Sequence, residues 1–206
     1  IRMMSHEVNN SIGAIGATLN VVSDILRQTQ DSDWQDVLPA VSASFERCGN
    51  LARFTSKLAD VVRIPEPVRA DLSLNELVRS VDALTRIECR KRNISLSLSL
   101  ADPDTIIRAD GIQLEQVLVN IVKNAYEAIG HDGRIRIVTT ADPPSVTVED
   151  NGPGIPEEIR KQLFTPFFTT KPSGQGIGLM FVREVLNNHR MAFSLTSQNG
   201  CTRFEI

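Results

Sequence analysis

Apolar side chains recur every three or four residues along the first sixty residues of the chain. In residues 1–29 these positions advance in steps of four and three, and they are Val8, Ile12, Ile15, Leu19, Val22 and Leu26. A second run, from Leu38 to Val62, keeps the same spacing. This spacing is typical of a helix-bundle seam. The pattern therefore predicts two long helices, joined by the polar segment 28–34.

A single hairpin of two such helices cannot bury both apolar stripes. We therefore expect a homodimer in which two hairpins complete a four-helix bundle. The alternative is that the hairpin packs against the rest of its own chain.

The pattern changes after residues 63–70, RIPEPVRA, whose two prolines indicate a linker. Strict alternation in ISLSLSL (94–100) predicts a strand with one solvent-exposed face. Further strands are expected at 105–109, 133–141, 145–150, 191–197 and 201–206, and helices at 75–92, 113–129 and 176–189. We predict an α+β chain with three parts: a helical hairpin forming a dimeric four-helix bundle (1–63), a linker (64–70), and an α/β sandwich with a mainly antiparallel sheet (71–206).

Composition narrows the function classes. The 206 residues are 41% hydrophobic and carry a formal net charge of -3, with Lys and Arg scattered, so we expect no nucleic-acid partner. Cys48, Cys89 and Cys201 lack metal-ligand spacing and are expected to be buried free thiols. No apolar run approaches the roughly 20 residues that cross a bilayer. The chain starts inside a helical pattern, so we expect a cytoplasmic fragment, without membrane contact of its own, of a longer protein.

Two motifs could bind the two ends of a nucleotide. Asn120 and Asn124 share one face of the predicted helix 113–129, and amide groups can coordinate Mg²⁺ or donate to phosphate. Taken alone, a solvated surface pair explains them better. In VEDNGPGIP (148–156), a strand ends at Asp150, followed by Gly152 and Gly154. A buried carboxylate there needs a donor, such as the adenine amine, although an ordinary turn is the alternative.

A third motif, FTPFFTTKPSGQGIGLM (164–180), leads into a helix. Backbone N–H groups at a helix start favour phosphate, and Thr169, Thr170 and Lys171 add hydroxyl and cationic donors. The motif is not a Walker A loop, because no Lys-Ser or Lys-Thr follows the last glycine. Three Phe residues in it are expected to anchor the loop by packing, namely Phe164, Phe167 and Phe168.

The order of these motifs resembles the ATP-binding domain shared by sensor histidine kinases, type II topoisomerases, mismatch-repair ATPases and chaperone ATPases, over roughly residues 71–206. The resemblance implies that Asp150 binds adenine, that Asn124 binds Mg²⁺, and that the loop between the glycine motifs covers the phosphates. The full set of implied cofactor-binding residues is Asn120, Asn124, Asp150, Gly152, Gly154, Thr169, Thr170, Lys171, Gly174, Gly176, Gly178 and Leu179.

Asn120 separates the branches of this family. Hydrolytic members usually place a water-activating Glu four residues before the Mg²⁺-binding Asn, and Asn120 cannot act as a base near neutral pH. This indicates phosphoryl transfer to a group other than water.

The segment SHEVNN (5–10) resembles the phosphoacceptor motif of sensor histidine kinases. His6 would be the nucleophile, with one ring nitrogen unprotonated. Glu7 would hold the proton on the other nitrogen. The resemblance implies that Asn10, one turn along the helix, helps to position water for dephosphorylating a partner regulator. Many relatives carry Pro five residues after the phosphoacceptor, where this chain has Ser11.

The sequence thus predicts a protein-histidine kinase. It would use ATP and Mg²⁺ to phosphorylate His6 and pass the phosphoryl group to an Asp of a response regulator, with phosphatase activity toward that regulator as a further expectation. Two alternatives stay open. One is an ATP-binding dimer that acts mainly as a phosphatase or scaffold, and the other is a hydrolytic ATPase, which Asn120 disfavours.

Overall fold

The computed structural model divides the chain into two compact units, residues 1–63 and 64–206, and each is described by itself. The structure describes residues 2–28, 37–62, 64–165, 168–171, 176–198 and 200–206. For residues 2–11, 27, 28, 37 and 52–62 the description extends to the helical backbone and not to the side chains. None of the described helices is long and apolar enough to cross a membrane.

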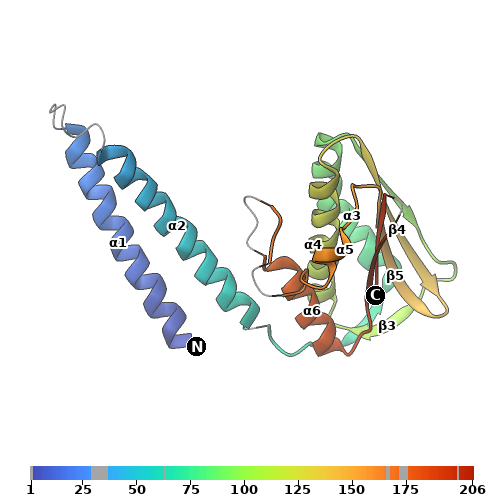
Figure 1. The fold of residues 1–206 in the computed structure, drawn as a ribbon. Coiled ribbons are helices and arrows are strands. Elements are labelled where there is room, and N and C mark those ends of the chain that lie inside the picture. Colours follow the sequence, from blue (N-terminus) through green and yellow to red (C-terminus); the bar gives the residue numbers. More distant parts are fainter. Residues whose placement is uncertain (1, 29–36, 63, 166–167, 172–175, 199) are drawn as a thin grey trace. The chain divides into compact units, whose positions relative to one another are not determined.

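The first unit consists of two helices that pack against each other, α1 (Arg2–Gln28) and α2 (Val37–Val62) (Figure 1). Where they meet, a Cβ atom at Gly16 would lie 3.9 Å from the Phe45 ring. Ile12 of the predicted stripe is buried, whereas Ile15 and Val22 are 53% and 36% exposed. The two predicted helices are confirmed, and one hairpin covers only part of the apolar stripe.

The second unit is built on a five-stranded sheet of order β2-β4-β5-β7-β6. Only the β2–β4 pair is parallel, which confirms the predicted, mainly antiparallel sheet. The sheet strands are β2 (Ile94–Ser99), β4 (Gly133–Ala141), β5 (Pro144–Asp150), β6 (Ser194–Gln198) and β7 (Cys201–Glu205). The helices are α3 (Leu74–Lys91), α4 (Gly111–Ile129), α5 (Glu157–Arg160) and α6 (Gly178–His189).

Two short elements of this unit were not predicted. Strand β1 (Ala70–Ser73) pairs with β3 (Ile106–Ala109) in a separate two-stranded antiparallel sheet. The single-turn helix α5 lies within the loop expected between the two glycine motifs. Both are only four residues long, too short for a hydrophobic period to identify them.

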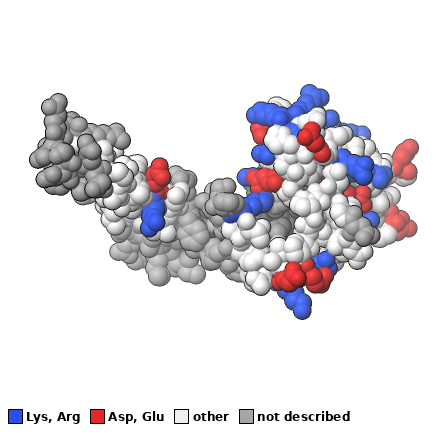
Figure 2. All heavy atoms as spheres, turned by 45° about the horizontal axis from the view of Figure 1, so that its top comes forward, with Lys and Arg blue, Asp and Glu red and all other residues white. Residues whose placement is uncertain are grey.

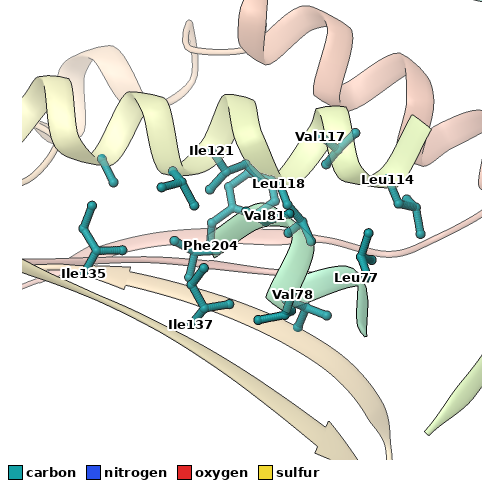
Figure 3. Close-up of a cluster of buried hydrophobic side chains, with 14 of the residues drawn as sticks. Leu77, Val78, Val81, Leu114, Val117, Leu118, Ile121, Ile135, Ile137 and Phe204 are labelled. Atoms are coloured by element: carbon teal, nitrogen blue, oxygen red, sulfur yellow. The ribbon is translucent and has the colours of Figure 1, made fainter. Parts of the chain in front are cut away.

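The core lies between the sheet and the helices that cover one of its faces (Figure 1). Figure 3 shows apolar side chains of α4 and α3 directed toward the sheet. The side chains labelled there are Leu77, Val78 and Val81 of α3, Leu114, Val117, Leu118 and Ile121 of α4, Ile135 and Ile137 of β4, and Phe204 of β7. In β2 the buried Ile94 and Leu96 alternate with exposed serines, as predicted.

The segment predicted as a linker makes several hydrogen bonds within the second unit. The Val68 N–H donates to Asp110 Oδ2 (2.9 Å), and Gln113 Nε2 donates to the Pro65 carbonyl (3.0 Å). Asp110 also caps α4 by accepting from the Gln113 N–H. Its own N–H donates to Nε2 of His189, which is buried at the end of α6. Residues 65–68 are therefore held against the start of α4.

The charged surface and the thiols agree only in part with what the composition predicts. Figure 2 shows Lys and Arg interspersed with Asp and Glu over the second unit on the face in view. All three cysteines are free, and Cys89 is buried as expected. Cys201 is exposed and Cys48 is half-buried, so the expectation of three buried thiols was wrong. Cys201 lies at the start of β7, next to the turn that joins it to β6.

The core can be tested with one matched pair of leucines. Leu118 is 2% exposed and Leu84 is 57% exposed. Leu118→Ala should lower the free energy of unfolding by about 2–5 kcal/mol, and Leu84→Ala by less than about 0.5 kcal/mol. Urea titrations followed by far-UV circular dichroism measure both. Equal midpoints for the two variants would contradict the described core.

Candidate functional site

Asp150 is a buried carboxylate at the end of β5, an inner strand of the sheet. It is 9% exposed, and its Oδ1 accepts a hydrogen bond from the Gly152 N–H (2.8 Å). Burial raises the pKa of the Asp150 carboxyl, and the Gly152 hydrogen bond acts in the opposite direction. A carboxylate kept in such a place gains from a polar ligand that donates to it.

The two glycines that follow Asp150, Gly152 and Gly154, stand at positions where a side chain does not fit. A Cβ atom on Gly152 would lie 2.8 Å from Asp150 Oδ1. Gly154 has a φ of +83°, and a Cβ there would lie 2.9 Å from Ser197 Oγ, the oxygen that accepts from the Ile155 N–H. Gly152 thus keeps main chain rather than a side chain beside the carboxylate, and Gly154 leaves room for the Ser197 hydroxyl.

Helix α4 brings the three predicted motifs together along its length. Near its middle, Asn120 donates to the Gln116 carbonyl (2.8 Å), and its Oδ1 would lie 3.3 Å from a Cβ on Gly178, the first residue of α6. At its C-terminal end, Ile129 is the residue that a Cβ on Gly152 would meet at 3.5 Å. One helix therefore contacts both glycine motifs.

The loop before α6 reaches α4 through Lys171. Its Nζ donates to Glu127 Oε2 (2.5 Å) and to Asn124 Oδ1 (3.2 Å). Its backbone N–H donates to Thr169 Oγ1 (3.1 Å). Asn124 and Lys171, predicted separately as Mg²⁺ and phosphate contacts, thus touch each other.

A family model described as "Histidine kinase-, DNA gyrase B-, and HSP90-like ATPase" matches residues 109–206. Sensor protein FixL of Bradyrhizobium diazoefficiens is 30% identical over 98% of this chain, which spans 42% of FixL. The catalytic domain of histidine kinase ThkA is 36% identical, with a TM-score of 0.61 over 67% of this chain and 94% of that domain.

The chain belongs to the sensor histidine kinase family. Histidine kinase ThkA, solved in complex with response regulator protein TrrA, is 26% identical, with a TM-score of 0.66 over 100% of this chain and 60% of that ThkA chain. The chain spans less than half of the length of FixL.

Further residues predicted from the histidine kinase resemblance lie as follows. Gly176 has a φ of +66°, and Leu179 lies in the first turn of α6. Within the described residues no side chain caps the start of α6, so its first N–H groups can donate to an anion. Thr169 and Thr170 are exposed on the loop. Gly174 lies outside the described residues.

The predicted phosphoacceptor segment lies in α1. His6 and Asn10 are one helical turn apart, and Glu7 follows His6. The side chains of all three lie outside the described part of the structure, so their predicted roles stay predictions.

Two outcomes concern residues outside the predicted nucleotide contacts. Glu127 was missed, although it stands three residues after Asn124 and therefore on the same side of α4. Phe164 was expected to anchor the loop, and its ring packs against Phe193 with centroids 5.4 Å apart. Phe167 lies outside the described residues.

The described residues fit an ATP molecule with its Mg²⁺. Asp150 offers a buried acceptor for the adenine amine, beside bare glycine backbone. Asn124 Oδ1 already accepts from a cationic group. Among the described residues no cluster of three His, Cys, Asp or Glu side chains could hold a metal alone. This is compatible with Mg²⁺, which commonly binds through few protein ligands together with substrate phosphates and water.

Asp150→Asn tests whether the carboxylate serves binding rather than stability. The Asn side chain keeps an oxygen that accepts from the Gly152 N–H. It removes the negative charge of the carboxylate, a charge that strengthens the hydrogen bond from the adenine amine. ATP affinity should fall about 10- to 100-fold, the range for a hydrogen bond to a charged group. Since the folded-state pKa of Asp150 is raised, ionisation destabilises the native state as pH rises above about 4 through that pKa.

Asp150→Asn should therefore gain stability relative to wild type as pH increases from 4 to 8. Nucleotide titrations measure the change in ATP affinity, and urea midpoints measure the change in stability. Asp142→Asn, at an exposed turn, is the control. Unchanged ATP affinity in Asp150→Asn, or a stability difference that moves the other way with pH, would contradict this role.

Proposed function

We propose that this chain is the catalytic core of a sensor histidine kinase. It transfers the γ-phosphoryl group of ATP to His6, and then passes it to an Asp of a response regulator. Phosphatase activity toward the same regulator forms part of the proposal, through Asn10.

The observation that carries this proposal is the arrangement along α4. Asn120 lies beside Gly178, Asn124 beside Lys171, and Ile129 beside Gly152. One helix therefore sets the spacing of three groups. These are the Asp150 carboxylate, suited to accept from adenine, the Asn124 oxygen, suited to bind a cation, and the start of α6, suited to bind phosphate. Bound Mg²⁺ would neutralise phosphate charge as the phosphoryl group leaves, with Asn124 as its protein ligand.

Asn120 favours transfer to a side chain over hydrolysis. Its amide nitrogen donates to the Gln116 carbonyl, and a neutral amide cannot take a proton from water near pH 7. A nucleophile that can attack without such a base is an imidazole with one unprotonated ring nitrogen. His6 supplies that nitrogen, and Glu7 would hold the proton on the other one while the bond to the leaving ADP oxygen breaks.

The proposed partners are a second copy of this chain and a receiver domain. On the hairpin, Ile15, Val22 and Phe45 are 36–53% exposed, an apolar surface that a second hairpin would cover. The related histidine kinase ThkA forms a complex with response regulator protein TrrA, which supports a regulator as the phosphoryl acceptor of this chain.

Autophosphorylation of His6 can be tested with Mg²⁺ and γ-labelled ATP on wild type, His6→Gln and Asn124→Ala. Wild type should take up label that is stable to alkali and lost in acid, as expected for a phosphoramidate. Both variants should lose at least about 90% of it, because one lacks the nucleophile and the other the cation-binding oxygen. Scintillation counting of the gel-resolved protein measures the label.

Asn188→Ala, on the exposed end of α6, is the control and should label like wild type. Absence of label in a wild type that still binds ATP would replace the kinase proposal with the phosphatase or scaffold alternative. Release of inorganic phosphate without labelled protein would indicate a hydrolytic ATPase instead.

A further inference from the structure

The Lys171 ammonium donates a hydrogen bond to Asn124 Oδ1, the oxygen that is proposed to bind Mg²⁺. Its ammonium lies 3.2 Å from Asn124 Oδ1 and 2.5 Å from Glu127 Oε2. The two partners are one helical turn apart on α4, and Lys171 is 44 residues from the nearer one. The contact therefore joins two segments that are far apart in the sequence, at the proposed nucleotide site.

The ammonium and Mg²⁺ cannot share the Asn124 oxygen easily. A coordinated Mg²⁺ would lie about 2.1 Å from that oxygen, and the ammonium already lies 3.2 Å from it. Two cations held on one atom repel each other strongly, since partly buried charges are poorly screened. Occupation by one cation therefore disfavours the other.

Glu127 decides where the Lys171 ammonium stays. The Lys171 and Glu127 side chains are 36% and 29% exposed, so the pair is partly shielded from water. Lys123 also approaches Glu127, but at 3.8 Å and with 55% of its side chain exposed. Among the described residues the carboxylate therefore has one close ion-pair partner, Lys171, and one distant partner on its own helix.

The pair is not part of the hydrophobic core. Neither residue belongs to the buried cluster that joins α3, α4 and the sheet. An ion pair of this exposure contributes little to stability, so the fold gives no reason for a lysine and a glutamate at these two positions. Their common neighbour, the Asn124 amide, gives one.

We propose that Glu127 is a positioning residue that holds the Lys171 ammonium on Asn124 Oδ1 in the nucleotide-free protein, in competition with Mg²⁺. When a nucleotide binds, Asn124 Oδ1 would hold Mg²⁺, and the Lys171 ammonium would be free to contact the nucleotide phosphates. The inference rests on the proposed nucleotide-binding function. By this competition the Lys171–Glu127 pair raises the Mg²⁺ concentration that nucleotide binding requires.

The test is a Mg²⁺ titration of the full 206-residue chain with a fixed concentration of a fluorescent ADP analogue. Lys171→Met should lower the half-saturating Mg²⁺ concentration about three- to fivefold, the range a partly exposed ion pair supplies. Lys123→Met removes the same charge from the neighbourhood of Glu127, and it should leave that concentration within about 1.5-fold of wild type.

A double-mutant cycle isolates Glu127. Glu127→Gln should lower the half-saturating Mg²⁺ concentration in the Lys171 protein and leave it unchanged or raise it in the Lys171→Met protein, because the competing ammonium is then absent. In EDTA, Lys171→Met should weaken nucleotide binding, whereas Glu127→Gln should not.

Three results would overturn the proposal: equal shifts in Lys171→Met and Lys123→Met, the same effect of Glu127→Gln in both backgrounds, or a raised Mg²⁺ requirement in Glu127→Gln alone. The last result would make Glu127 a carboxylate that attracts the metal. If wild type binds no nucleotide at any Mg²⁺ concentration, the proposed function itself fails.

Discussion

The site depends on how α4 packs. Its apolar stripe, which includes Val117, Leu118 and Ile121, is buried against the sheet and α3, and this burial fixes the rotation of the helix about its axis. Asn120, Asn124 and Glu127 then lie on a different side, toward α6 and the loop that carries Lys171. A rotation of α4 would expose apolar area and move the amides away from the glycine motifs. The packing of the core therefore also determines the geometry of the site.

The strand end supplies the complementary constraint. A buried carboxylate is destabilising in its ionised form, and the raised pKa of Asp150 expresses that effect. The sheet tolerates it because one oxygen accepts from the Gly152 backbone, and because glycine there leaves room for a ligand. The site thus combines a destabilised acceptor with a rigid helix, an arrangement that gains stability when a nucleotide binds.

Much of this arrangement could be predicted from the sequence. The long helices and the alternating strands have strong periods, and the glycines at 152 and 154 mark close backbone approaches that the structure confirms. The four-residue β1 and α5 carry too few residues to show a period. The contact of Lys171 with Glu127 joins positions 44 residues apart, and no local pattern encodes such a pairing. The exposure of Cys201 was also missed, because it depends on where β7 begins rather than on its residue type.

Delivery of the phosphoryl group from this ATP site to His6 is the central claim. The most direct measurement is ³¹P NMR of the chain incubated with ATP and Mg²⁺. A phosphoramidate resonance should appear as ATP is converted to ADP, and it should be absent from His6→Gln. Accumulation of inorganic phosphate in both proteins, without a phosphoramidate resonance, would contradict the claim.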